Sequence, residues 1–357
     1  RSNGLVLSNL ANTRVQWETT ARANVGLDLG LFNDRLNVQA DFYHSTTSDL
    51  LTLQPLPEIT GLRYFWSNGG EMTNTGWELA AQLKVLNTRD FQWELGLSAG
   101  GYVNEVQSLP DNRPIISALY GGEMITQVGQ PYASFYGYKT TGVYKTRDEA
   151  EAGGLTKLMN DGSYAPFGAG DMIFEEVVKD GVIDEKDRQI IGNPTPSLYG
   201  NFSTRMNYKR WSLNAVFAYS LGNEVYNYYR RNLESGMNYN NQTLAMNRRW
   251  TGEDQDTDMP RAVYGDPMGN ARFSDRWIED GSYLRFKNLS IAYELPLNSE
   301  FIEGLSVWAS GENLYTWSRY LGLDPEVSAG NSVFQQGIDI GLLPPTRSYS
   351  IGVKINL

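Results

Sequence analysis

The sequence contains no cysteine and only one histidine, His44, among its 357 residues. The absence of cysteine excludes disulfides, thiol chemistry and structural zinc sites held by thiolates. With one histidine and no nucleophile-elbow pattern, the sequence offers no catalytic triad. We therefore expect a protein that is not an enzyme.

The sequence also lacks any apolar run of about 18 residues, which excludes a transmembrane helix. A membrane location stays open, because the strands of a β-barrel alternate apolar and polar residues and average out as polar. The net charge of −11 argues against a nucleic-acid partner. The chain begins at Arg1 without a basic region and an apolar leader, so we expect either a mature product or, as we favour, a fragment of a longer protein.

The main positive feature is a strict alternation of apolar and polar residues. Side chains of a strand point to opposite faces in turn, so this alternation predicts strands with one apolar face. A tilted strand crosses a bilayer with roughly 9–11 residues. Nine segments carry the pattern: residues 21–29, 36–42, 77–85, 91–99, 198–208, 212–221, 289–295, 305–310 and 348–357. Several strand ends are aromatic, as at Trp77 and Trp211, which fits girdles at the membrane interfaces.

Short and long connections alternate between these segments. Tight turns are expected at residues 32–35, 87–90 and 209–210, whereas long polar stretches cover residues 46–75, 108–197, 222–281 and 322–346. Outer-membrane barrels have short periplasmic turns, long extracellular loops and, in single-chain bacterial barrels, even strand numbers. Because nine is odd, we expect residues 1–15 to lie in an extracellular loop and residues 1–357 to be the C-terminal part of a larger barrel.

Several motifs resemble those of the SusC/RagA-type TonB-dependent outer-membrane transporters. They are GQPYASFYGY (129–138), GVY (142–144), GDM (170–172), DGVIDEKDR (180–188), IGNPTP (191–196), EDGSYLRFKN (279–288) and PTRSYSIGV (345–353). The resemblance covers essentially the whole chain, and its motifs occur in the family's order.

This resemblance implies an all-β fold, a transmembrane antiparallel β-barrel of about 22 strands with long extracellular loops. The chain would supply about nine C-terminal strands, with the plug domain and the TonB box absent from this sequence. It implies a nutrient importer of oligosaccharides, or of peptides, in the outer membrane of Bacteroidetes-type bacteria. The implied partners are a SusD-type lipoprotein lid, TonB, the N-terminal half of the same barrel, and lipid or lipopolysaccharide. The alternatives are a soluble or surface β-sandwich, acting in carbohydrate binding or adhesion, and a barrel enzyme.

One acidic turn matches part of a calcium-binding loop, within the long loop at residues 108–197. Such loops need oxygen ligands at positions 1, 3, 5, 7, 9 and 12 and glycine at position 6. The candidate ligands are Glu176, Asp180, the carbonyl of Val182, Asp184 and Asp187. Val178 leaves position 3 without a side-chain oxygen, so the alternative is a rigid acidic turn without metal. Apart from this candidate calcium, we expect no cofactor.

Aromatic and amide side chains cluster in the long polar stretches. Sugars present apolar ring faces and many hydroxyl groups, which suit sites built from aromatic rings and amides. The candidate substrate-binding residues are Tyr64, Trp66, Asn68, Tyr226, Tyr228, Tyr229, Arg230, Trp317 and Tyr320. The same residue types also favour packing within the loops or against a lid protein, and the sequence leaves these alternatives open.

Overall fold

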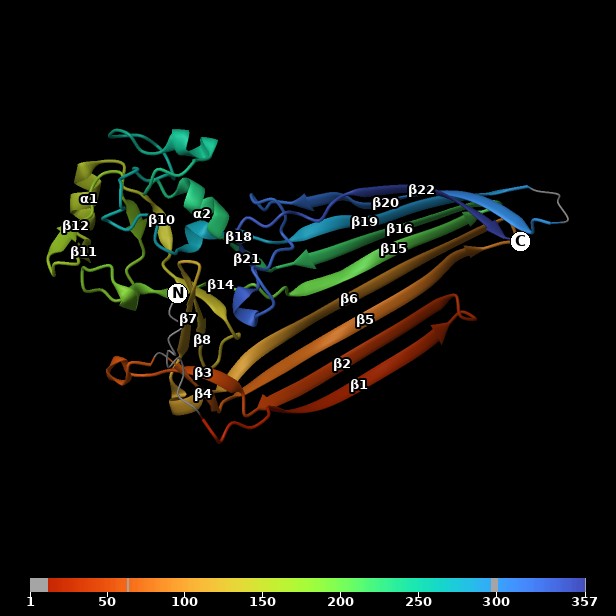
Figure 1. Cartoon of the computed structure of the whole chain (residues 1–357), viewed down its shortest axis with the longest axis horizontal. Coiled ribbons are helices and arrows are strands. Elements are labelled where there is room, and N and C mark those ends of the chain that lie inside the picture. The colour runs from red at the N-terminus through yellow and green to blue at the C-terminus, as the bar shows by residue number, and fades with distance from the viewer. Residues whose placement is uncertain (1–11, 63, 297–300, 357) are drawn as a thin grey trace, which may run out of the picture.

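The structure is a computed structural model that describes residues 12–62, 64–296 and 301–356. Its main element is an antiparallel sheet in which nine strands follow one another in chain order (Figure 1). The strands are β1 (Thr19–Leu31), β2 (Leu36–Ser48), β5 (Glu71–Asn87), β6 (Phe91–Ser108), β15 (Leu198–Tyr208), β16 (Trp211–Leu221), β19 (Tyr283–Leu295), β20 (Gly304–Ser318) and β22 (Ser348–Asn356). All nine predicted strands are confirmed, with Leu357 outside the described residues.

Most of the strands are longer than the alternating segments that predicted them. β5 has 17 residues, β6 has 18 and β20 has 15. The added residues of β5 and β6 lie mainly toward the long loops and include polar ones such as Asn74 and Asn104. The apolar alternation marks only part of each strand, because hydrogen bonding between strands continues where the side chains on both faces are polar.

The two faces of the sheet differ in chemistry, and the apolar face is open. On β22, the exposed fractions of Tyr349, Ile351 and Val353 are 73%, 82% and 60%. We call this side the apolar face and the opposite side the polar face. In a sandwich the apolar face would pack on a second sheet. The exposed row therefore counts against the sandwich alternative.

Aromatic rings stack across three neighbouring strands on the apolar face. The ring of Phe217 on β16 lies 4.5 Å from that of Phe202 on β15 and 4.4 Å from that of Phe286 on β19. Both pairs are within 8° of parallel. Cross-strand aromatic pairs of this kind stabilise a sheet by roughly 0.2–1 kcal/mol each, and they fix its register.

Short turns lie at one end of the sheet and long connections at the other, as the sequence predicts (Figure 1). We call the three longest connections, residues 109–197, 222–282 and 319–347, the loop unit. Its strands are short: β7 (Ile115–Leu119), β8 (Gly122–Thr126), β9 (Ser134–Gly137), β10 (Thr140–Val143), β11 (Thr156–Leu158), β12 (Tyr164–Pro166), β13 (Met172–Phe174), β14 (Gln189–Gly192), β17 (Glu224–Asn227), β18 (Ile278–Asp280) and β21 (Ile338–Asp339). Its helices are α1 (Arg147–Gly153) and α2 (Tyr228–Glu234). No helix of the described residues is long and apolar enough to cross a membrane.

The loop unit contains its own hydrophobic cores, in line with the alternative that its aromatic residues pack within the loops. The first core gathers Phe135, Tyr226, Trp277 and Ile338, and thus joins all three connections. The second core includes Tyr144, Phe167, Met172, Phe174, Ile183 and Met268. These stretches read as polar loops because each of their strands has only two to five residues, too few for a periodic pattern.

The remaining long connection forms a hairpin of β3 (Leu51–Pro55) and β4 (Tyr64–Asn68) at the same end of the sheet (Figure 1). The backbone N–H of Gln16 donates to Asn68 Oδ1 over 2.8 Å, so the segment before β1 also lies with a long connection. The extracellular loop expected at residues 1–15 stays a prediction, and residues 1–11 lie outside the described residues.

Candidate functional site

The structure does not bring the predicted substrate-binding residues together in one open site. Tyr226 is 1% exposed in the first core, and its hydroxyl donates to the carbonyl of Tyr120 over 3.0 Å. Burial raises the pKa of Tyr226 to about 12. Tyr320 is 9% exposed and donates to Asp339 Oδ2 over 2.7 Å. Burial, followed by this hydrogen bond to a carboxylate, raises the pKa of Tyr320. Both side chains hold the loop unit together instead of lining an open site.

Arg230 is also part of the internal packing. Its Nε donates to Glu279 Oε1 over 2.5 Å and its Nη1 donates to Glu234 Oε2 over 3.2 Å. The ring of Trp277 lies 5.1 Å from the guanidinium carbon. Tyr228 packs partly buried against the first core. Polar and aromatic side chains do cluster here, but they bind other residues of the loop unit.

The other candidates are spread over three places. Asn68 donates to the carbonyls of Gln16 and Asp49, and so joins the hairpin to the start of β1. Trp317 lies on β20 opposite Leu284, on the apolar face, with its ring 4.8 Å from that of Tyr315. Trp66 and Tyr229 are each 43% exposed and stay predictions, whereas Tyr64 lies in β4 with its side chain outside the described residues.

The acidic turn is held by hydrogen bonds within the protein. Asp187 is fully buried and accepts backbone N–H donors from Val177, Val178 and Asp184 at 2.8–3.1 Å. Glu176 accepts from the N–H of Gly181 over 2.5 Å.

A lysine lies between two of the candidate calcium ligands. Lys186 Nζ lies 3.2 Å from Asp180 and 3.3 Å from Asp184. The N–H of Val182, followed by Lys186, lowers the pKa of Asp180. No cluster of three or more histidine or acidic side chains suited to a metal occurs among the described residues. These contacts account for the turn without a metal, and calcium binding stays a prediction.

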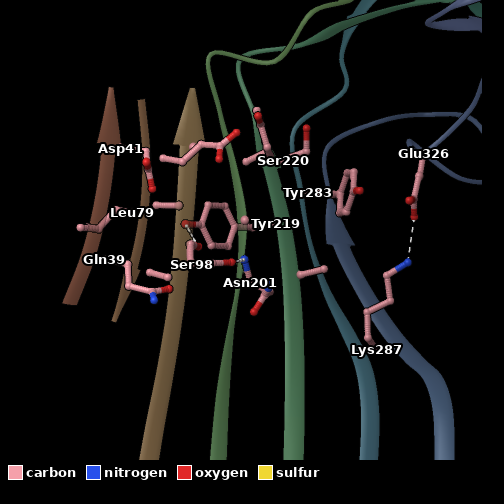
Figure 2. A pocket seen from close by; sticks show the side chains of 17 residues that line it. Gln39, Asp41, Leu79, Ser98, Asn201, Tyr219, Ser220, Tyr283, Lys287 and Glu326 are labelled. Carbon is pink, nitrogen blue, oxygen red and sulfur yellow. Dashed lines mark hydrogen bonds and ion pairs between the residues drawn. The ribbon is translucent and has the colours of Figure 1, made fainter. Parts of the chain in front are cut away.

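The structure instead assembles a cavity of about 600 Å³ on the polar face. Figure 2 shows Asp41, Ser98, Asn201 and Tyr283 along its wall, and they come from four different strands. Strand register explains the convergence, because one row across the sheet runs through Asp41, Glu78, Gly100, Tyr199, Ser220 and Tyr283. Polar alternation predicted the face of Asp41, Glu78 and Ser220, but nothing in it marked them as one site.

A loop closes one side of this cavity. Residues 319–347 fold over the polar face, and Asp324 Oδ1 lies 2.5 Å from Arg285 Nη2. Glu326 lies 3.0 Å from Arg285 Nη1. It also lies 3.1 Å from Lys287 Nζ, and Figure 2 marks this second pair with a dashed line. Arg285 is 1% exposed, and a buried cation of this kind requires such partners.

Glycine lets tyrosine rings lie across neighbouring strands on the polar face. A Cβ atom on Gly76 would stand 2.6 Å from Cζ of Tyr43, and one on Gly100 would stand 3.3 Å from Cζ of Tyr199. The guanidinium carbon of Arg22 lies 4.2 Å from the centre of the Tyr43 ring. The ends of both rings thus lie over the backbone of β5 and β6, where a larger residue would displace them.

A second cavity of about 310 Å³ lies at the loop end of the polar face. Asn104 Nδ2 donates to Asn74 Oδ1 over 2.7 Å in its wall, beside Tyr102 and Tyr132. Burial raises the pKa of Tyr132 to about 12, so this phenol stays protonated at neutral pH. The two cavities place amides, carboxylates and tyrosines along one polar face, from the loop end toward the middle of the sheet.

Comparison with known proteins assigns the chain to a family. Residues 3–314 match the family described as TonB dependent receptor-like, beta-barrel. The chain is 33% identical to TonB-dependent receptor P3 of Formosa agariphila, over 99% of this chain and 35% of that protein. It is 25% identical to TonB-dependent receptor SusC of Bacteroides thetaiotaomicron, over 96% of this chain and 32% of that protein.

Solved structures give the same result. A structure of the RagAB peptide transporter superposes with a TM-score of 0.80 and 26% identity, over 99% of this chain and 36% of that chain. The chain therefore belongs to the TonB-dependent receptor β-barrel family and is of the SusC/RagA type. It spans about a third of the length of the relatives that it matches.

Proposed function

We propose that this chain is the C-terminal part of the barrel wall of a nutrient importer in the bacterial outer membrane. The cargo would be an oligosaccharide or a peptide, and the chain would guide it without covalent chemistry. The observation that carries the proposal is the contrast between the faces. Ile351 stands 82% exposed on the apolar face, while the polar face lines a cavity of about 600 Å³. Lipid suits the first face and an aqueous passage suits the second.

The partners follow from the same arrangement. The edge strands β1 and β22 each pair with one neighbour among the described residues, and an open sheet edge is not stable in hydrocarbon. The proposal therefore includes the N-terminal part of the same barrel, whose strands would pair with these edges. It also includes TonB, acting through that part, and a SusD-type lipoprotein over the loop unit. RagAB is described as a peptide importer, which makes peptide cargo a specific alternative.

The experiment is to delete the full-length gene and to measure the uptake of labelled oligosaccharides and peptides by intact cells. We expect the uptake of one cargo class to be lost and to return with the complementing gene. Purification from native outer membrane should yield the lipoprotein lid in the same complex. Unchanged uptake of every cargo in the deletion strain would contradict the proposal.

A further inference from the structure

The cavity on the polar face carries two carboxylates on one side without a cationic partner in the described part of the chain, and this arrangement indicates which kind of ligand it could bind. Asp41 on β2 and Glu78 on β5 stand directly opposite each other in the register. Asp41 accepts one hydrogen bond, from Asn24 Nδ2 over 3.1 Å. Within the described residues, no lysine or arginine nitrogen lies within ion-pair distance of either carboxylate. Like charges at opposed positions destabilise a sheet, so the pair has a cost that a ligand could relieve.

An aromatic ring borders this carboxylate pair. Tyr199 is two strands from Glu78 in the same row, with only Gly100 between them. The end of its ring reaches over Gly100, where a Cβ atom would be 3.3 Å away. Gly100 pairs with Glu78 on the next strand, and adjacent strands lie about 4.8 Å apart. The phenol of Tyr199 therefore lies about one strand spacing from Glu78. Ser98 and Asn201, one row below, add a hydroxyl and an amide.

We propose that Asp41, Glu78 and Tyr199 form a binding subsite for one ring of a neutral oligosaccharide in the wall of the passage. This inference rests on the proposed import function and selects one of its two cargo classes. Ionised carboxylates only accept hydrogen bonds, and a sugar offers several hydroxyl donors. The apolar C–H face of the sugar ring would lie on Tyr199. An acidic cargo would be repelled by both carboxylates.

The subsite offers a peptide no backbone edge. One way in which extended peptides gain affinity is to add a strand to a sheet edge, where backbone groups are unpaired. β2, β5, β6 and β15 are each paired on both sides, so their backbone offers no such edge. A peptide here would leave its own amides to be satisfied by side chains alone. A lysine-rich peptide is the strongest competing cargo, because its charge would suit Asp41 and Glu78.

The test uses the full-length transporter with its lid, purified from outer membrane. The probes are linear oligosaccharides of glucose, xylose and mannose, and synthetic peptides that include a lysine-rich set, with binding measured by native mass spectrometry. Tyr199→Leu keeps bulk over Gly100 but removes the ring, and we expect it to weaken sugar binding at least about tenfold. Tyr199→Phe should stay within about twofold. Glu78→Gln should weaken sugar binding with little dependence on salt, because the sugar is uncharged.

Tyr208→Leu is the matched control, since Tyr208 lies on the same strand but is 51% exposed near the end of the apolar face. It should bind sugar like the wild type, and heat-modifiable migration in gels verifies the fold of each variant. If Tyr199→Leu does not fold, Asp41→Asn takes its place with the same expected loss. Binding of peptides but no sugar, or full sugar affinity in Tyr199→Leu, would overturn the inference and leave import intact. A transporter that takes up neither cargo overturns both proposals.

Discussion

The guanidinium of Arg261 donates two hydrogen bonds of 2.8 Å each to the carboxylate of Asp171, which lies 90 residues away in the sequence. Asp171 is fully buried and also accepts from Asn270 Nδ2 over 2.9 Å and from the N–H of Gly168 over 2.8 Å. This carboxylate joins two connections of the loop unit beside the second core. It lies within the GDM motif at residues 170–172, so the motif has a structural role.

Replacing this carboxylate should loosen the loop unit. Asp171→Ala leaves the donors of Arg261, Asn270 and Gly168 without their acceptor, and breaking such a pair costs on the order of 3 kcal/mol. Hydrogen exchange of residues 140–175 should accelerate while the sheet stays protected. Asp161→Ala, on an exposed turn with Ser163, is the matched control and should change little. Unchanged exchange in Asp171→Ala would show that the packing, and not this carboxylate, holds the unit.

The orientation of the sheet can be tested with two lysines on neighbouring positions of β22. Ile351→Lys puts a charge in lipid near the middle of the strand, which costs about 2–4 kcal/mol in a barrel. Ser350→Lys points to the polar face and should be tolerated. The measurement is the urea midpoint of the full-length protein in lipid vesicles. If the apolar face were in water, both variants would be nearly neutral, since Ile351 is 82% exposed.

The ion pairs of Arg285 should control the position of the loop at residues 319–347. Arg285→Ala leaves Asp324, which is 6% exposed, as a buried charge without its partner, at a cost of roughly 3–5 kcal/mol. We expect the loop to leave the polar face, which proteolysis at residues 319–347 would detect. Lys287→Ala serves as the comparison, because Lys287 pairs with the half-exposed Glu326 and should have a smaller effect. Equal protease resistance of both variants and wild type would contradict the assigned role.

Glu224 gives the loop unit a predictable pH dependence. Burial, opposed by the N–H of Asn193, raises the pKa of Glu224 above its usual 4.5, and Asp280 adds to the rise. The folded state therefore retains a proton that the unfolded chain has lost, and stability falls as pH increases from 4.5 through the folded pKa. Glu224→Gln should remove this fall and protect residues 189–227 better at neutral pH, with little change at pH 4.

Hydrogen exchange at matched pH compares this variant with the wild type. Glu253→Gln, at an exposed position, controls for the loss of one negative charge. Lower protection of Glu224→Gln at neutral pH would mean that the ionised carboxylate stabilises the fold.

The acidic turn at residues 176–188 should keep its shape without calcium. Its carboxylates already bind backbone N–H groups and Lys186, so chelation with EDTA should leave hydrogen exchange in the turn unchanged. Asp187→Asn should accelerate exchange with or without EDTA. A calcium-dependent gain in protection, with saturable binding in titration calorimetry, would instead establish the calcium site predicted from the sequence.

Much of the sheet could be predicted because its signal is local. The alternation at residues 198–208 and 348–357 located β15 and β22 with their apolar faces, and the alternating loop lengths placed the short turns at one end of the sheet and the long connections at the other. The candidate site could not be predicted in the same way. The sequence predicts Tyr226 and Tyr320 as substrate-binding residues, yet both are buried, and each hydrogen-bonds a partner that no motif encodes.

The sequence by itself determined which segments form the strands of the large sheet and which side of each strand is apolar. Both properties depend on the two-residue repeat of the strand, which every short segment carries. Only the tertiary structure decided which polar side chains meet. The row from Asp41 to Tyr199 depends on the register of four strands, and the contact between Asp171 and Arg261 depends on two folded loops. Contacts of this kind form when distant segments pack together, so no local pattern records them.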